Sequence, residues 1–147
     1  FLKLDHQTGY DILRGHIEKY RPNVLVIDPI YKIIQGNPLD AHAVQVLLDN
    51  LDKLIAEYNL GILLISHTRK GEYEEHSNGS DDLLGSVLYS AWADSIIKVE
   101  RKEHGLLEVK FEVIRHAEEE LNSVMVKMDD KLDFQPIPIN LLENLKL

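Results

Sequence analysis

Two polar residues that follow apolar runs are the first candidates for chemistry. Asp28 directly follows the run Val24–Ile27, and His67 follows the run Ile62–Ile65 after one intervening serine. An unbroken apolar run of this length suits a strand that is buried on both faces of a parallel sheet. Because ligands bind at the carboxyl ends of the strands in open parallel sheets, we expect Asp28 and His67 to lie at a ligand-binding edge.

Two explanations of Asp28 stay open at this point. Four apolar residues followed by an aspartate match the Walker B pattern, in which the carboxylate holds the magnesium ion of a bound nucleotide through its water shell. Many parallel strands also end in an aspartate that only caps the following loop. The motif alone does not decide between nucleotide chemistry and a structural role, so the order of the surrounding elements matters.

The elements around these runs predict an α/β domain. From Thr8, whose hydroxyl we expect to cap a helix, apolar residues recur at three- and four-residue spacing as far as Tyr20. Asp40 caps a longer helix with one apolar stripe, which Asn59 and Gly61 end. The order strand, long helix, strand is typical of a right-handed parallel crossover, the unit of doubly wound sheets with helices on both faces.

The pattern changes after the second apolar run. Residues 70–82 are rich in Gly, Ser, Asn and acidic residues and predict a long loop, and residues 83–92 restore a helical face. Gly105 marks a hairpin, and residues 134–147 suit an edge strand followed by a short helix. Three further segments predict strands: residues 95–100, 106–114 and 123–128.

Several motifs, taken in order, carry a resemblance to a known family. They are NVLVIDPIY at 23–31, GILLISHTRK at 61–70, LGS at 84–86, WADSII at 92–97 and FEVIRHAE at 111–118. From about Arg21 to Met128 the chain resembles the RecA-like ATPases of the DnaB and RepA helicase group. The resemblance implies a RecA-like, mostly parallel sheet with flanking helices and a carboxyl-terminal antiparallel extension, present here as a partial domain.

The same resemblance implies roles for three residues. Asp28 would be the Walker B carboxylate near magnesium, and His67 would stand where the family has a Gln or His that senses the terminal phosphate and relays hydrolysis toward DNA-facing loops. Arg115 would match an arginine that reaches the nucleotide of a neighbouring subunit. ATP and Mg are the implied cofactors, and a homo-oligomeric, hexameric ring is the implied assembly. Without the resemblance, His67 also suits a half-buried loop histidine and Arg115 a surface arginine.

Two departures bear on these roles. Many DnaB-type sequences have a lysine two residues before the arginine, where this chain has Val113, so the contact is made differently or the chain belongs to the RepA-like branch. The predicted loop after the second strand would repel DNA phosphates, which leaves the loop of residues 33–39 as the alternative contact with single-stranded DNA. Its acidic residues are Glu72, Glu74, Glu75, Asp81 and Asp82.

A third departure is the lack of a phosphate-binding loop. No GxxxxGK[ST] sequence occurs, so no backbone amides of that motif wrap the β- and γ-phosphates. We expect that loop, and the carboxylate that activates water, to precede Phe1. The chain alone should therefore bind nucleotide feebly and hydrolyse none.

Composition narrows the remaining classes. The 147 residues, 44% of them hydrophobic, suit one domain, with residues 1–130 as the carboxyl-terminal part of a RecA-like core and 131–147 as a tail. A net charge of -9 argues against a broad nucleic-acid surface, so any contact with DNA is local. The absence of cysteine excludes disulfides and thiolate metal sites, and the seven histidines lack zinc-site spacing. No apolar stretch is long enough to span a bilayer, and we expect a cytoplasmic protein.

We therefore expect a fragment of an ATP-hydrolysing, DNA-associated motor of replicative-helicase or RepA type. Two alternatives stay open: a RecA-like scaffold without ATPase activity, and a recombination or signalling ATPase. A phosphate-binding loop upstream of Asp28 would favour an ATPase over the scaffold. Strand separation by the full-length protein would distinguish a helicase from the other ATPases.

Overall fold

The computed structural model describes four ranges of the chain, residues 2–37, 40–67, 87–119 and 121–137. The chain divides into two compact units, which we call the amino-terminal unit (residues 1–92) and the carboxyl-terminal unit (residues 93–147). The predicted acidic loop of residues 70–82 and the short helix predicted near the carboxyl end lie outside the described residues.

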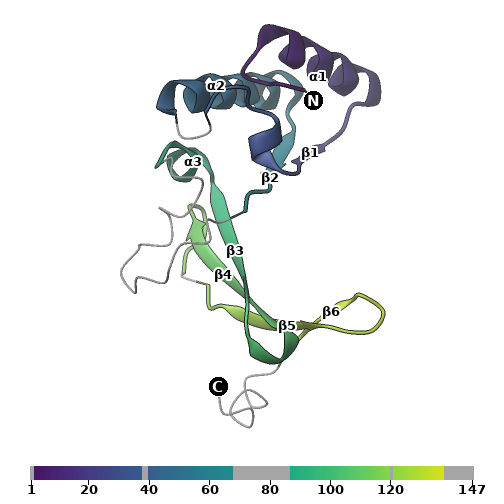
Figure 1. The fold of residues 1–147 in the computed structure, drawn as a ribbon, viewed down its shortest axis with the longest axis vertical. Helices are drawn as coiled ribbons and strands as arrows, with labels where there is room; N and C mark the ends of the chain where they lie inside the picture. The colour runs from purple at the N-terminus through teal and green to yellow at the C-terminus, as the bar shows by residue number, and fades with distance from the viewer. Residues whose placement is uncertain (1, 38–39, 68–86, 120, 138–147) are drawn as a thin grey trace. The chain divides into compact units, whose positions relative to one another are not determined.

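The amino-terminal unit alternates helices and strands (Figure 1). Its described elements are α1 (Gln7–Tyr20), β1 (Val24–Ile27), the 3-10 helix η1 (Ile30–Lys32), α2 (Ala41–Tyr58), β2 (Gly61–Leu64) and α3 (Val87–Trp92). β1 and β2 pair in parallel, with Val24 opposite Gly61 and Ile27 opposite Leu64. Because α2 connects two parallel strands, the predicted strand–helix–strand crossover is confirmed.

The ends of α2 also follow the sequence prediction. The side chain of Asp40 caps the helix by accepting a hydrogen bond of 3.0 Å from the backbone amide of His42. Asn59 ends it in the left-handed conformation, with φ of 51°. Between these ends, five side chains of the helix are buried: Val44, Leu47, Leu48, Leu51 and Leu54.

The start of α1 differs from the prediction. His6 is the residue before the helix, and no side chain caps it, so the expected Thr8 cap is wrong. The first turn instead packs directly against the backbone of Lys3, because a Cβ atom at Gly9 would clash with the Lys3 carbonyl. Close backbone contact, which only glycine permits here, replaces the cap.

A buried apolar core joins these helices to one face of the β1–β2 sheet. Leu25 and Ile62 pack against this core from the strands. Val24, Val26 and Leu63, on alternate positions, are 59%, 55% and 52% exposed. The expectation of strands buried on both faces is therefore wrong for β1 and β2. A uniformly apolar run gives no signal about which of its faces has a packing partner.

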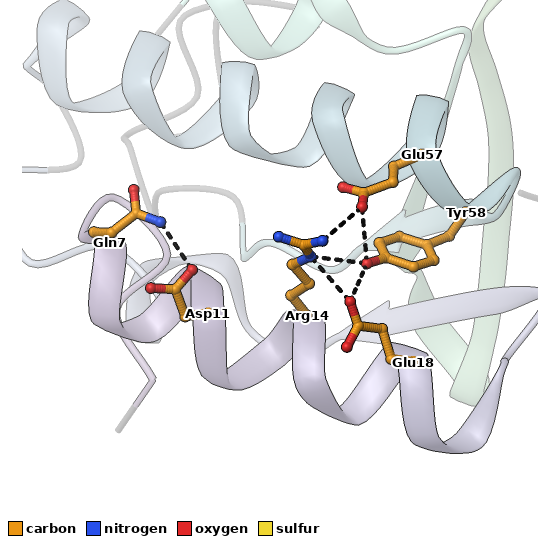
Figure 2. A network of polar contacts seen from close by, with 6 residues as sticks. All are labelled: Gln7, Asp11, Arg14, Glu18, Glu57 and Tyr58. Carbon is orange, nitrogen blue, oxygen red and sulfur yellow. Dashed lines mark hydrogen bonds and ion pairs between the residues drawn. The ribbon is translucent and has the colours of Figure 1, made fainter.

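Arg14 ties α1 to α2 on the outside of this core (Figure 2). Its Nε donates to the Tyr58 hydroxyl at 2.9 Å, and its Nη2 donates to Glu57 at 2.9 Å. The Tyr58 hydroxyl donates in turn to Glu18 at 2.8 Å. The bond to Tyr58 and the charge of Glu57 raise the pKa of Arg14 further above its usual value. These side chains are solvent-exposed, so they fix how the two helices meet more than they add to stability.

The carboxyl-terminal unit is an antiparallel sheet in the order β3-β4-β5-β6. Its elements are β3 (Ser95–Arg101), the 3-10 helix η2 (Glu103–Gly105), β4 (Leu106–Ile114), β5 (Val124–Met128) and β6 (Phe134–Pro136). Gly105 has a positive φ of 74° and turns the chain between β3 and β4, as predicted. The expected antiparallel part of the fold is thus present as a sheet of its own, with β6 as an edge strand.

The two faces of this antiparallel sheet differ in chemistry. Glu100 accepts a hydrogen bond of 2.9 Å from Lys110 and pairs with Lys98 at 3.0 Å, all on one face. Ile97 and Val99 alternate with these residues along β3 and are exposed. Charge is therefore gathered on one face and apolar surface on the other.

Candidate functional site

Asp28 is exposed at the carboxyl end of β1, as the sequence predicts. The residues that follow it, Pro29 and Ile30, are buried, and the peptide bond from Asp28 to Pro29 is cis. The carboxylate therefore sits on a strand end that the core anchors on both sides, since Ile27 is buried as well. This is the location at which parallel sheets bind ligands.

Two backbone hydrogen bonds hold the ends of β1 and β2 together beyond the last paired residues. The amide of Ile65 donates to the carbonyl of Ile27 at 2.9 Å, and the amide of Ile30 donates to the carbonyl of Ile65 at 2.9 Å. They extend the ladder past Leu64 and bracket Asp28 between two bonded positions. The residue after β1 and the residue after β2 therefore leave the sheet at the same edge.

His67 follows at this edge and is also exposed. The hydroxyl of Ser66 donates a long hydrogen bond of 3.4 Å to the His67 carbonyl. The structure thus brings Asp28 and His67 to the carboxyl edge of one two-stranded sheet, on neighbouring strands. An exposed carboxylate and an exposed imidazole at such an edge can bind a hydrated cation and donate a hydrogen bond to an anion.

Arg115 lies in the carboxyl-terminal unit, directly after β4. Its amide donates to the carbonyl of Asp94 at 3.0 Å, and its Nε donates to the carbonyl of Ala93 at 3.0 Å. The neighbouring His116 ring lies 3.8 Å from the Asp94 carboxylate, both side chains being highly exposed. Arg115 is therefore an exposed guanidinium that backbone carbonyls hold along one edge, within a different unit from Asp28 and His67.

The donor set fits magnesium better than a metal bound by protein alone. Within the residues that the structure describes, no group of three or more His, Asp or Glu side chains could hold a metal ion. A single exposed carboxylate such as Asp28 suits Mg²⁺, which keeps several waters and takes other ligands from nucleotide phosphates. No helix in the described part of the chain is long and apolar enough to cross a membrane.

Comparison with known proteins agrees with this geometry. The family model of the AAA domain matches residues 3–72, a range that includes Asp28 and His67. The solved ATPase domain of a DnaB-like helicase matches with a TM-score of 0.63 and 17% identity, over 88% of this chain and 50% of that chain. The chain has a RecA-like ATPase fold. It spans half the length of the solved chain, and no curated protein matches its sequence.

The comparison confirms the fold that the sequence motifs implied for this RecA-like chain. The AAA domain match contains both strands of the parallel sheet and ends before α3. It leaves out Arg115, so the role predicted for that residue rests on the motif alone. Sequence reasoning also missed Lys3 and Asp5, which bind the loop after η1 through backbone groups and follow no local motif.

Proposed function

We propose that this RecA-like chain is part of an ATP-hydrolysing motor that acts on DNA, of the replicative-helicase or RepA type. The observation that supports the proposal most directly is the placement of Asp28 and His67 at the carboxyl edge of β1 and β2, joined by the Ile27–Ile65 hydrogen bond. An AAA domain match over the same residues adds to it. In this proposal Asp28 is the Walker B carboxylate and His67 the sensor of the terminal phosphate.

The chemistry of each group follows from its type. Asp28 would hold the water shell of Mg²⁺, and Mg²⁺, when bound with ATP, neutralises charge on the β- and γ-phosphates. His67 would donate a hydrogen bond to the terminal phosphate and lose that partner after hydrolysis. Both side chains are exposed, and neither needs to move out of a core to meet a ligand.

Arg115 has its role in a neighbouring subunit under this proposal. Its Nε is held by the Ala93 carbonyl, which orients the guanidinium at the end of β4. A guanidinium that reaches the next nucleotide would stabilise the charge that develops on the transferred phosphoryl group. We propose a hexameric ring of identical subunits for this reason. Residues 1–130 would belong to the ATPase core and 131–147 to a tail, in a cytoplasmic protein.

DNA binding is proposed for the loop after η1. The acidic composition of residues 70–82 disfavours phosphate contacts there. Tyr31, by contrast, is 45% exposed in η1 and offers an aromatic face close to the loop of residues 33–37. With a net charge of -9, contact with single-stranded DNA has to be local.

The proposal is tested by Asp28→Asn in the full-length protein. This change removes charge and keeps the volume, so we expect Mg²⁺-dependent ATP hydrolysis to be abolished while the protein remains folded. Asp11→Asn is the matched control, because Asp11 is an exposed carboxylate on α1 that only Gln7 is seen to bond. Unaltered turnover in Asp28→Asn would refute the assignment. A wild-type protein that hydrolyses no ATP would favour a scaffold, and the chain of residues 1–147 alone should be inactive.

A further inference from the structure

The backbone of residues 3–5 runs beside the loop that follows η1. The amide of Leu4 donates to the carbonyl of Ile33 at 2.7 Å. The ammonium group of Lys3 donates to the carbonyls of Lys32 at 2.9 Å and Ile34 at 2.7 Å. Three consecutive carbonyls of this loop are therefore held from a segment about thirty positions earlier in the sequence, the separations being 29 and 31 for the Lys3 bonds.

Asp5 holds the next part of the same loop by its amides. Its carboxylate accepts hydrogen bonds from the amide of Gln35, at 2.8 Å to Oδ2 and 3.0 Å to Oδ1, and from the amide of Gly36 at 3.1 Å. Hydrogen bonds from backbone amides to an ionised carboxylate are stronger than those between neutral groups. We call residues 32–36 the clamped loop.

The segment that holds the clamped loop is itself rigidly supported. The Leu4 side chain is 2% exposed in the core, and its carbonyl accepts a hydrogen bond of 2.8 Å from Asn50 on α2. The close contact of Gly9 with the Lys3 carbonyl fixes the segment against α1 as well. Asp5 thus stands on a segment that both long helices and the core hold in place.

The clamped loop lies between this segment and α2. A Cβ atom at Gly36 would come within 2.9 Å of the Ala43 side chain, so the loop packs directly on the helix. Ile30 and Ile34, on either side of Tyr31 and Lys32, are buried. The exposed backbone at Gln35 and Gly36 is the part of the loop that the Asp5 carboxylate alone fixes among the bonds described above.

We propose that Asp5 is a positioning residue, which holds Gln35 and Gly36 so that the clamped loop presents one fixed conformation to single-stranded DNA. The functional half rests on the proposed function, in which this loop contacts DNA. A loop that is already ordered loses less conformational entropy when it binds, so its affinity is higher. Without Asp5 the loop would remain anchored by Ile34 but would sample several conformations at Gln35 and Gly36.

Amide hydrogen exchange in the full-length protein tests the structural half. In Asp5→Ala we expect exchange at Gln35 and Gly36 to be about tenfold faster or more, since two charge-assisted bonds are lost. The core amides of Leu47 and Leu51 should keep their rates, which separates local loosening from general destabilisation. Asp5→Asn should give an intermediate rate, because the amide keeps one acceptor oxygen but turns an NH2 group toward a backbone donor.

Asp11→Ala serves as the matched control and should leave exchange at Gln35 and Gly36 unchanged. Wild-type exchange rates at these two amides in both Asp5 variants would overturn the proposal. If Asp5→Ala does not fold, Asp5→Asn alone decides it, because it retains the volume of the side chain. Faster exchange throughout α2 in both variants would also overturn it, since Asp5 would then be a general stabilising residue.

Binding of a fluorescent oligothymidine to the full-length protein tests the functional half. We expect the dissociation constant to rise by about three- to tenfold in Asp5→Ala and by less in Asp5→Asn, with Asp11→Ala equal to wild type. Faster exchange with unchanged DNA affinity would overturn the functional half. A wild-type protein that does not bind the oligonucleotide would refute the proposed DNA function, while the exchange result still decides whether Asp5 positions the loop.

Discussion

The amide of Ile65 donates a 2.9 Å hydrogen bond to the carbonyl of Ile27, one residue before Asp28. This bond continues the β1–β2 ladder past its last paired residues and makes the exit from one strand depend on the exit from the other. His67, two residues after Ile65, is therefore attached to the same edge as Asp28. A group that senses phosphate and a group that holds its metal ion need such a shared, rigid attachment.

Substitution of His67 distinguishes a catalytic contact from a loop histidine. In the full-length protein we expect His67→Ala to lower ATP turnover by about a hundredfold, the cost of one lost hydrogen-bond donor to the reacting group. His67→Gln should keep part of the activity, because glutamine can also donate. His42→Ala is the control, since His42 is an exposed histidine in the first turn of α2. Steady-state hydrolysis equal to wild type in His67→Ala would count against the role.

Much of this edge could be predicted because its signals are local. The apolar runs define β1 and β2, and Asp40 and Asn59 define the helix between them, so the positions of Asp28 and His67 followed from chain order. Each of these signals lies within a few residues of the element that it specifies. Strand ends in a parallel crossover then come to one edge by geometry alone.

The parts that could not be predicted depend on contacts between distant segments. Asp5 carries no motif, and its partners Gln35 and Gly36 become visible only when the chain folds back. The Thr8 cap failed for the same reason, because the close packing of Gly9 on Lys3 is a tertiary contact. The exposure of Val26 likewise depends on which elements face the sheet, and its own sequence context does not report this.

Arg115 should act across a subunit boundary if the proposed ring forms. We expect Arg115→Ala to lower turnover of the full-length protein by about a thousandfold, as expected for loss of an arginine that stabilises phosphoryl transfer. Mixing it with Asp28→Asn should restore part of the activity, because some interfaces then pair an intact Asp28 with an intact Arg115. Arg101→Ala, an exposed arginine on β3, is the control. Failure of the mixture to recover activity would contradict action in trans.

Tyr89 on α3 predicts a gain in stability from a lost hydroxyl. In the described part of the chain its hydroxyl is buried without a hydrogen-bond partner. Burial, with a smaller effect of the Asp5 charge, raises the pKa of Tyr89 to about 12. Tyr89→Phe should therefore leave the free energy of unfolding unchanged or raise it by about 1 kcal/mol in urea titrations near neutral pH. Tyr58→Phe, which breaks the bonds to Arg14 and Glu18, should lower it, and a large loss in Tyr89→Phe would contradict the burial of an unpaired group.

The charged face of the carboxyl-terminal sheet predicts a loss of stability in acid. Hydrogen bonds from Lys110 and Lys98 hold the pKa of Glu100 at about 2, below the 4.5 of an isolated glutamate, although burial opposes them. The folded state therefore binds the proton less readily than the unfolded state. The resulting stabilisation is complete above about pH 4.5 and is lost as the pH falls through about 2.

A double-mutant cycle with Glu100→Gln and Lys110→Met measures this contribution in the full-length protein. Because the Glu100 side chain is 28% exposed, solvent screening reduces the coupling, and we expect about 1 kcal/mol at pH 7 from urea unfolding. The coupling should decline below pH 4.5 and approach zero near pH 2, where the Glu100 carboxylate takes up its proton. A coupling energy that stays constant between pH 7 and pH 2 would show that the pair contributes through packing of its side chains and not through charge.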